Sequence, residues 1–325
     1  MTLIEQCKES CKKNPKRVVL PDANDIRVVE AASQLSSQGL AIPVLIGNPF
    51  VLRDIAIDGG ISLTGIQIIN PASSAKFDAY CEAYRVKNSK KNFSQQECIN
   101  ALLNPLFFAS MMLDQGDADF CIAGNLSTTG DVIRAALRCV GLAEKANTVS
   151  SFFIMVSPDG SEVRAFSDAA VVPLPNEDQL ADITIDTANN FQRLTGISPR
   201  VALLSFSTKG SAEHPMVQKV RDAFEQVKSR EPGLLVDGEL QFDAAVSPDV
   251  ARKKAPDSPL MGDSNVLIFP SLNAGNIAYK VAQRLCGYDA LGPMLQGLAK
   301  PVHDLSRGCS ADDIIDITVL ASRMA

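Results

Sequence analysis

The chain has 325 residues, of which 46% are apolar and 21% are charged, so it is long enough for about two domains and too apolar for global disorder. Lys and Arg together number 31 and Asp and Glu number 37, which leaves a formal net charge of −6. This charge excludes a general nucleic-acid binder, whereas a local cluster of arginines can still bind an anionic substrate.

No apolar run reaches the roughly 18 to 20 residues needed to cross a bilayer, and residues 1–17 lack the apolar core of a signal peptide. The eight cysteines form no CxxC pair. His214 and His303 are the only histidines, which is too few for a multi-histidine metal site. We therefore expect a cytoplasmic protein without a metal site, whose cysteines are reduced and mostly buried.

The first part of the chain alternates between strands and helices. An apolar run at 17–21 predicts a strand, and after turn residues at 22–25 a helix from Ile26 ends near Gly39. Further strands are expected at 42–47 and 118–124. A polar loop at 125–130 then leads into a helix at 131–140, with Ile133, Leu137 and Val140 expected to face the core. This order predicts a parallel sheet with helices on both faces.

The second part opens with a different pattern. The β-forming run 149–156, a Pro-Asp-Gly turn and the run 162–166 predict an antiparallel hairpin at the edge of a sheet. Strands at 200–206 and 265–270, each followed by a helix, then restore the α/β pattern. We therefore predict two α/β domains with mainly parallel sheets, the second with a small antiparallel edge. Their expected bounds are 1–146 plus 294–325 and 147–293, with the chain returning to the first domain at Gly292-Pro293.

Polar loops follow several of these strands, at the ends where open α/β sheets bind their ligands. One loop contains Ser127, Thr128 and Thr129, and another runs from Ser207 to Gly210. Such loops can bind phosphate through backbone N–H groups, but the same residues are equally consistent with ordinary helix caps. Neither dinucleotide-binding nor P-loop spacing occurs, so no nucleotide motif favours the first interpretation.

The most informative stretch is 292–310, which combines glycines and prolines with Lys300, Ser306 and Arg307 just before the final helix. With it, the chain resembles the phosphate acetyltransferase (phosphotransacetylase) family in its short form without an extra regulatory domain. The resemblance runs nearly end to end. It is carried by the segments 17–21, 116–119, 167–171, 202–211, 237–243, 254–259, 275–280 and 292–310.

The resemblance implies two α/β domains with an active-site cleft between them, and a homodimer. It also implies reversible transfer of an acetyl group, in which acetyl-CoA and phosphate give CoA and acetyl phosphate, without a cofactor or metal. Butyryl or propionyl transfer stays open, because the sequence does not reveal the volume of the acyl pocket. A metal- and NAD-dependent dehydrogenase of related fold is a third hypothesis, although we do not find its motifs. A fourth hypothesis is a catalytically silent binding protein that keeps the fold.

The family's site residues can be carried onto this sequence. Ser306 and Arg307 would form the active-site pair, and Asp313 would be the base for the CoA thiol, with Asp312 as the second choice. The expected substrate-binding residues are Arg27, Arg85, Ser127, Thr128, Thr129, Arg134, Lys280 and Lys300.

The chemistry of these residue types supports part of this assignment. A guanidinium such as that of Arg307 can bind phosphate with two hydrogen bonds and stabilise the charge that develops on the carbonyl oxygen. Asp313 has a second interpretation, because residues 310–313 also form a capping box. A helix N-terminus stabilises a charged carboxylate, which opposes a role as base. Cys309 is expected to be an alkylatable bystander, with the acetyl group passing directly between the substrates.

Overall fold

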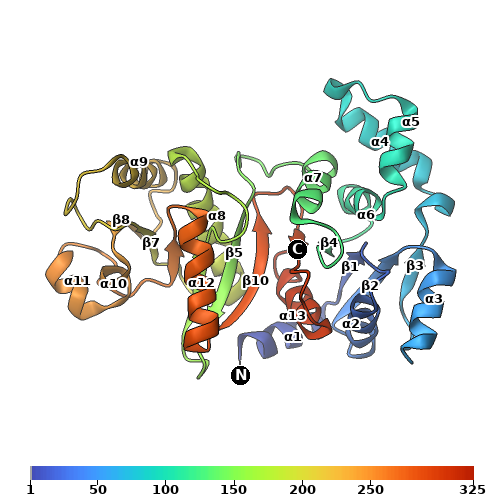
Figure 1. Cartoon of the computed structure of the whole chain (residues 1–325), viewed down its shortest axis with the longest axis horizontal. Coiled ribbons are helices and arrows are strands. Elements are labelled where there is room, and N and C mark those ends of the chain that lie inside the picture. The colour runs from blue at the N-terminus through green and yellow to red at the C-terminus, as the bar shows by residue number, and fades with distance from the viewer. Residues whose placement is uncertain (1) are drawn as a thin grey trace. The chain divides into compact units, whose positions relative to one another are not determined.

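The computed structural model describes residues 2–325. The chain forms two compact units, and the first runs to Glu144 and resumes from Leu298 to Ala325, while the second is Lys145–Gly297 (Figure 1). Both units are α/β, one with a wholly parallel sheet and one with an antiparallel edge. The predicted fold class of two mainly parallel α/β domains is confirmed.

The first unit contains a five-stranded parallel sheet in the order β11-β4-β1-β2-β3. Its strands are β1 (Lys16–Leu20), β2 (Ala41–Ile46), β3 (Gln67–Ile69), β4 (Phe120–Ala123) and β11 (Val302–Asp304). Its α-helices are α1 (Leu3–Lys13), α2 (Ile26–Ser37), α3 (Pro49–Asp58), α4 (Phe77–Lys87), α5 (Gln95–Leu102), α6 (Pro105–Asp114), α7 (Thr129–Cys139) and α13 (Ala311–Ala321). Helices α2 and α13 pack together on one face, and α6 and α7 pack together on the other (Figure 1).

The strand order creates the place where a ligand site is expected. From β1 the chain proceeds through β2 to β3 on one side, and then returns to place β4 on the other side of β1. All five strands are parallel, so the segments that follow β1, β4 and β11 leave from the same edge. A crevice at such a topological switch point is the usual ligand site of an open α/β sheet.

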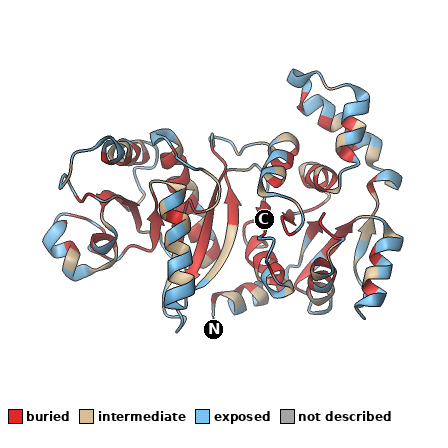
Figure 2. Ribbon diagram, in the orientation of Figure 1, coloured by how far each residue is buried: buried red, intermediate tan, exposed pale blue. Residues whose placement is uncertain are grey.

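The second unit contains a six-stranded sheet in the order β10-β5-β6-β9-β7-β8. Its strands are β5 (Ser150–Val156), β6 (Val163–Ser167), β7 (Val201–Leu204), β8 (Val236–Leu240), β9 (Val266–Ile268) and β10 (Asp289–Gln296). Its helices are α8 (Glu177–Thr195), α9 (Pro215–Arg230), α10 (Phe242–Val246), α11 (Pro248–Lys254) and α12 (Leu272–Cys286). The β5–β6 hairpin is antiparallel as predicted. The strands of both units are mostly buried, whereas the outer faces of the helices are exposed (Figure 2).

The predicted return point at Gly292-Pro293 is wrong. These two residues lie inside β10, which pairs antiparallel with β5 and is interrupted between Leu291 and Met294. A proline is tolerated there because β10 is an edge strand and the ladder is irregular at this position. The chain leaves the second unit after Gly297.

The fold bears on two further expectations. All eight cysteines are free, and each except Cys286 is buried, as the composition predicted. None of the helices within residues 2–325 has the length and apolarity required to cross a membrane.

Candidate active site

Asp22, just after β1, holds the loop that follows β4. The carboxylate is buried, and its Oδ2 accepts the backbone N–H groups of Gly124 at 2.8 Å, Leu126 at 3.2 Å and Ser127 at 3.1 Å. Its Oδ1 accepts the Ser127 hydroxyl at 2.6 Å. A carboxylate of the chain therefore occupies the N–H groups that a phosphate cradle in this loop would use. Sequence reasoning did not identify Asp22, although its place after a strand is a usable signal.

Asp304, the last residue of β11, binds the end of the same loop through its side chain. The Thr129 hydroxyl donates to Asp304 Oδ2 at 2.5 Å, and the strands approach so closely that a Cβ on Gly124 would collide with Asp304 Oδ1. Gly124 has a φ of +109°, which also requires glycine. Burial, with a smaller contribution from the charge of Asp22, raises the pKa of Asp304 to about 6.

Thr128 is the N-cap of α7, because its side chain accepts the Asp131 N–H at 3.2 Å. Its hydroxyl also donates to the Asp131 carboxylate at 2.8 Å. Thr128 is therefore a helix cap and not part of an open phosphate-binding loop. The hydroxyls of Ser127 and Thr129 are also bound to carboxylates of the chain.

Ser306 and Arg307 lie in a tight turn beyond the end of β11. The turn is closed by the Cys309 N–H, which donates to the Ser306 carbonyl at 3.0 Å. Both residues are exposed. The Arg27 guanidinium donates to the carbonyl oxygens of Arg307 at 2.9 Å and Cys309 at 2.5 Å. The structure thus brings Arg27 together with the Ser306-Arg307 pair.

Asp313 is exposed and forms the predicted capping box at the start of α13. Its Oδ2 accepts the Ser310 N–H at 2.8 Å and the Ser310 hydroxyl at 2.9 Å, while the Asp313 N–H donates to Ser310 Oγ at 3.1 Å. The helix cap is confirmed. The role of Asp313 as base stays a proposal.

Arg85 and Arg134 are exposed on α4 and α7, and each pairs with a carboxylate three residues earlier. Arg85 lies 2.7 Å from Glu82, and Arg134 lies 2.5 Å from Asp131. Exposed pairs of this kind contribute little to stability, so neither ion pair holds its guanidinium group firmly. Arg307 differs from these arginines, because it forms no ion pair with any residue that the structure describes.

The core face of α7 was predicted only in part. Val140, just past its end, is buried, but Leu137 is 42% exposed and Ile133 is only half-buried. The residues that face the core are Val132, Ala135, Ala136 and Cys139. Small alanines allow α7 to pack closely on α6 and β11. The larger apolar residues Ile133 and Leu137 therefore do not mark the face of α7 that packs on the core.

Two predicted residues lie elsewhere. Lys300 is exposed and precedes β11, so it lies at the amino end of this strand, whereas Ser306 and Arg307 follow its carboxyl end. The intervening strand, at about 3.3 Å per residue, keeps Lys300 away from the turn, and a role beside Arg307 is not supported. Lys280 is exposed on α12 in the second unit.

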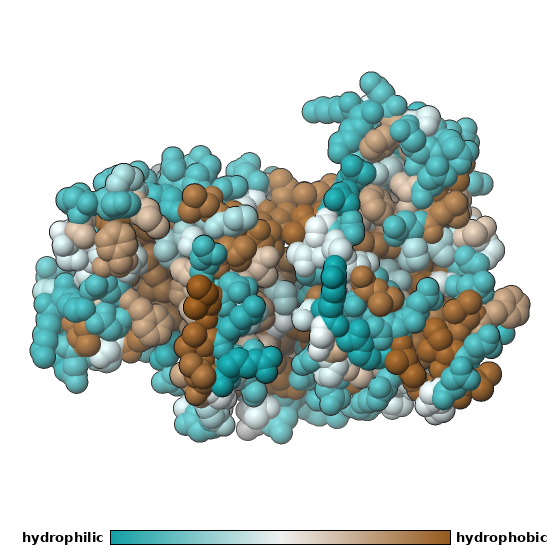
Figure 3. Space-filling view, viewed as in Figure 1, coloured by the Kyte–Doolittle hydropathy of each residue, from teal (hydrophilic) through white to brown (hydrophobic). Residues whose placement is uncertain are grey.

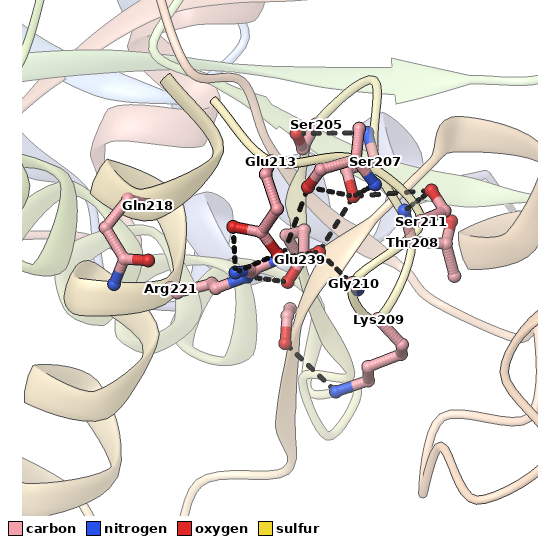
Figure 4. Close-up of polar contacts among 12 residues, drawn as sticks. Ser205, Ser207, Thr208, Lys209, Gly210, Ser211, Glu213, Gln218, Arg221 and Glu239 are labelled. Carbon is pink, nitrogen blue, oxygen red and sulfur yellow. Dashed lines mark hydrogen bonds and ion pairs between the residues drawn. The ribbon is translucent and has the colours of Figure 1, made fainter. Parts of the chain in front are cut away.

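The Ser207–Ser211 loop after β7 is not an open phosphate cradle either. Each backbone N–H from Ser207 to Ala212 donates within the loop, to Ser205, or to Glu239. Glu239 also accepts the Ser207 hydroxyl at 2.9 Å and pairs with Arg221 at 3.0 Å (Figure 4). Burial alone would raise the pKa of Glu239, but the hydrogen bonds from Arg221, Gly210 and Ser207 lower it to about 2.

Glu239 and Arg221 were missed by sequence reasoning, although Glu239 lies in the family-like segment 237–243. Their partners are distant in sequence, so only the fold shows the network. Within residues 2–325, no group of three or more His, Cys, Asp or Glu side chains has the arrangement of a metal site.

Comparison with known proteins identifies the family. A model of the family described as phosphate acetyl/butaryl transferase matches residues 2–322. The phosphate acetyltransferase of Thermoanaerobacterium thermosaccharolyticum is 43% identical over 321 residues, which cover 98% of this chain and 97% of that protein. That of Acetivibrio thermocellus is 40% identical over 329 residues, covering 100% and 98%.

Solved structures agree with these relatives. A phosphotransacetylase from Streptococcus pyogenes has a TM-score of 0.95 and 38% identity, covering 99% of this chain and 97% of that chain. One from Staphylococcus aureus has a TM-score of 0.93 and 37% identity, covering 99% and 98%. The chain therefore belongs to the phosphate acetyl/butaryl transferase family.

Proposed function

We propose that this protein transfers an acetyl group directly between CoA and phosphate within a ternary complex. It is an acyltransferase, and the reaction runs reversibly from acetyl-CoA and phosphate to CoA and acetyl phosphate. Full-length relatives at 40% to 43% identity that carry the name phosphate acetyltransferase support the acetyl group over butyryl or propionyl.

The observation that carries the proposal is the state of Arg307. Its side chain is exposed beyond the switch-point edge of the first sheet and is unpaired among the described residues, whereas Arg27, Arg85 and Arg134 each pair with a carboxylate. A planar guanidinium binds a phosphate oxyanion with two hydrogen bonds. Among these four arginines, Arg307 is thus the one that is not bound to a carboxylate and whose guanidinium can bind a phosphate group.

In the direction of acetyl-CoA formation, the CoA sulfur attacks the carbonyl carbon of acetyl phosphate. The bond from that carbon to the phosphate oxygen breaks, phosphate leaves with the electron pair, and the thiol proton passes to Asp313. Arg307 stabilises the leaving phosphate and the tetrahedral transition state, and Ser306 orients the reacting groups by hydrogen bonding. Holding both substrates within reach can supply roughly 7 to 11 kcal/mol.

An acetyl-enzyme intermediate is not required. Cys309 is the cysteine closest in sequence to the Ser306-Arg307 pair and so the candidate nucleophile. It is buried, with 6% of its surface exposed, and this burial raises the pKa of its thiol. Such a thiol is a poor nucleophile. Radiolabelled acetyl phosphate without CoA should therefore leave no label on the denatured protein. Stoichiometric label on a peptide containing Ser306 or Cys309, formed at a competent rate, would overturn direct transfer.

The test of the function is to mix the protein with CoA and acetyl phosphate and follow thioester formation, with butyryl phosphate in parallel. Arg307→Ala should lower turnover by about 10²–10³-fold while the fold persists. Arg252→Ala is a control for loss of an exposed arginine outside the proposed site, because Arg252 lies on α11 in the second unit, where it pairs with Asp249. Wild-type turnover in folded Arg307→Ala would contradict the assignment.

We further propose that no metal or organic cofactor takes part, so that EDTA leaves the basal rate unchanged. A cytoplasmic location is supported by the buried free thiols. A homodimer is supported by α12, where Ile277, Val281 and Leu285 are 62%, 45% and 80% exposed at intervals of four residues. This apolar stripe is visible over α12 in Figure 3, and a second copy of the chain would cover it.

A further inference from the structure

Arg27 has most of its hydrogen-bonding capacity bound to the chain itself. Its Nε donates to the Asp25 carboxylate at 3.0 and 3.2 Å, and its Nη2 donates to Asp25 Oδ2 at 2.5 Å. Its Nη1 donates to two backbone carbonyls, those of Arg307 at 2.9 Å and Cys309 at 2.5 Å. A guanidinium has five N–H groups, so these contacts leave a single N–H of Nη2 for a ligand.

Asp25 fixes Arg27 from the other side. Asp25 is the N-cap of α2, where its Oδ1 accepts the Arg27 backbone N–H at 2.9 Å. Its side chain is only 10% exposed, compared with 31% for Arg27. The hydrogen bond from Arg27 lowers the pKa of Asp25, although burial opposes this shift. The pair is therefore a charged, two-point contact anchored on a helix that packs against α13.

The two carbonyls that Arg27 binds belong to the turn that carries the active-site pair. Ser306 and Cys309 close this turn through one backbone hydrogen bond, and Arg307 is its second residue. Binding the carbonyls of its second and fourth residues fixes the orientation of two peptide groups, and with them the direction in which the Arg307 side chain leaves the backbone. Residues 306–308 of the turn are exposed and Cys309 is buried, and among the described residues only the Arg27 side chain binds these two carbonyls.

We propose that Arg27 is a positioning residue, which together with Asp25 braces the 306–309 turn, and that it acts on the reaction through Arg307. This inference rests on the proposed function, and it replaces the expectation that Arg27 binds substrate. A preorganised cation supports catalysis only while it stays aimed at the transition state. A misplacement of about 1 Å can cost about 10²-fold in rate.

The two roles predict different kinetics. For a brace, Arg27→Ala lowers kcat by about 10²-fold and changes KM for acetyl phosphate and CoA by less than about 3-fold. Arg27→Lys stays close to Arg27→Ala, because one ammonium cannot replace a fork that binds a carboxylate and two carbonyls. Asp25→Asn also lowers kcat. The double variant with both substitutions has the same kcat as Arg27→Ala alone. For direct substrate binding, Arg27→Ala raises KM, and the effects of the two substitutions add.

A second measurement does not depend on activity. Hydrogen exchange at the Cys309 amide, which closes the turn, should be faster in Arg27→Ala and Asp25→Asn than in the wild type, with amides of the β1–β4 ladder unchanged. Arg252→Ala should change neither exchange nor kinetics. If the wild type makes no acetyl thioester, the proposed function fails. The hydrogen-exchange result still shows whether Arg27 and Asp25 hold the 306–309 turn in place. Unchanged Cys309 exchange, or a raised KM with normal kcat, would overturn this role.

Discussion

In each of the two units, a buried aspartate accepts hydrogen bonds from several backbone N–H groups. In the first, Asp22 follows β1 and accepts N–H groups from the loop after β4. In the second, Asp168 follows β6 and accepts the N–H groups of Ala170 at 3.1 Å, Val171 at 3.3 Å and Val172 at 2.6 Å. In both loops a carboxyl group of the chain occupies backbone N–H groups of the kind that bind phosphate in other α/β proteins. These two loops are therefore not open phosphate cradles.

Asp313 can be tested at the residue scale without destroying its cap. Asp313→Asn keeps an oxygen for the Ser310 N–H but cannot accept the thiol proton. Turnover should fall further than in Asp312→Asn, because only Asp313 is proposed to take the thiol proton. Steady-state rates of acetyl-CoA formation check this. If both variants melt early and keep their specific activity, Asp313 is only a helix cap.

Asp304 provides a pH-dependent test of stability. Its pKa in the folded protein is about 6, against an ordinary 3.8, so the folded state disfavours the charged form. As pH rises from about 4 to about 6, this group lowers the free energy of unfolding by about 3 kcal/mol, and above that window the loss is constant. Asp304→Asn keeps an acceptor for Thr129 and lacks the charge.

The advantage of Asp304→Asn over the wild type should therefore grow between pH 4 and 6 and then level off. Urea unfolding at pH 4.0, 5.0, 6.0 and 7.5 measures it. A difference that is the same at every pH would show that the carboxyl group does not titrate in this range.

At the scale of elements, Glu239 joins β8, α9 and the loop after β7. Glu239→Gln keeps the shape but leaves Arg221 without its buried counter-charge, which should cost about 3 kcal/mol. The matched control is Glu213→Gln, because Glu213 pairs with the same Arg221 but has a side chain that is 79% exposed. This control should change stability little.

The pH dependence of Glu239 has the opposite sign to that of Asp304. Its folded pKa of about 2 lies below the ordinary 4.5, so its contribution to stability is complete above pH 4.5 and is lost as pH falls toward 2. Thermal melts from pH 3 to pH 7 should show that Glu239→Gln loses less stability in acid than the wild type does. Equal acid sensitivity would refute a charged Glu239 in the folded state.

At the scale of the whole molecule, the proposed homodimer can be tested on α12. Leu285→Lys and Ile277→Lys place charges in the apolar stripe and should shift the protein from dimer to monomer in sedimentation velocity. Ile57→Lys is the matched control, because Ile57 is 75% exposed on α3 in the first unit. A dimer that persists in both α12 variants would exclude this face as the interface.

Local features of this protein were determined by the sequence alone. The strand–helix alternation, the β5–β6 hairpin and the Ser310–Asp313 cap depend on residues close together in the chain, where periodicity and turn chemistry act directly. The segments that resemble phosphate acetyltransferases run nearly end to end, so the family and the Ser306-Arg307 pair could also be proposed from the sequence.

The tertiary structure decided which of these residues meet. Arg27 binds carbonyls that lie 280 and 282 residues away, and Asp22 binds an N–H that is 102 residues away. Such contacts depend on the order of strands in the sheet, which local patterns do not encode. The same order places Lys300 at the amino end of β11 and the Ser306–Cys309 turn beyond its carboxyl end, although they are close neighbours in the sequence. A short strand between them separates two edges of the sheet.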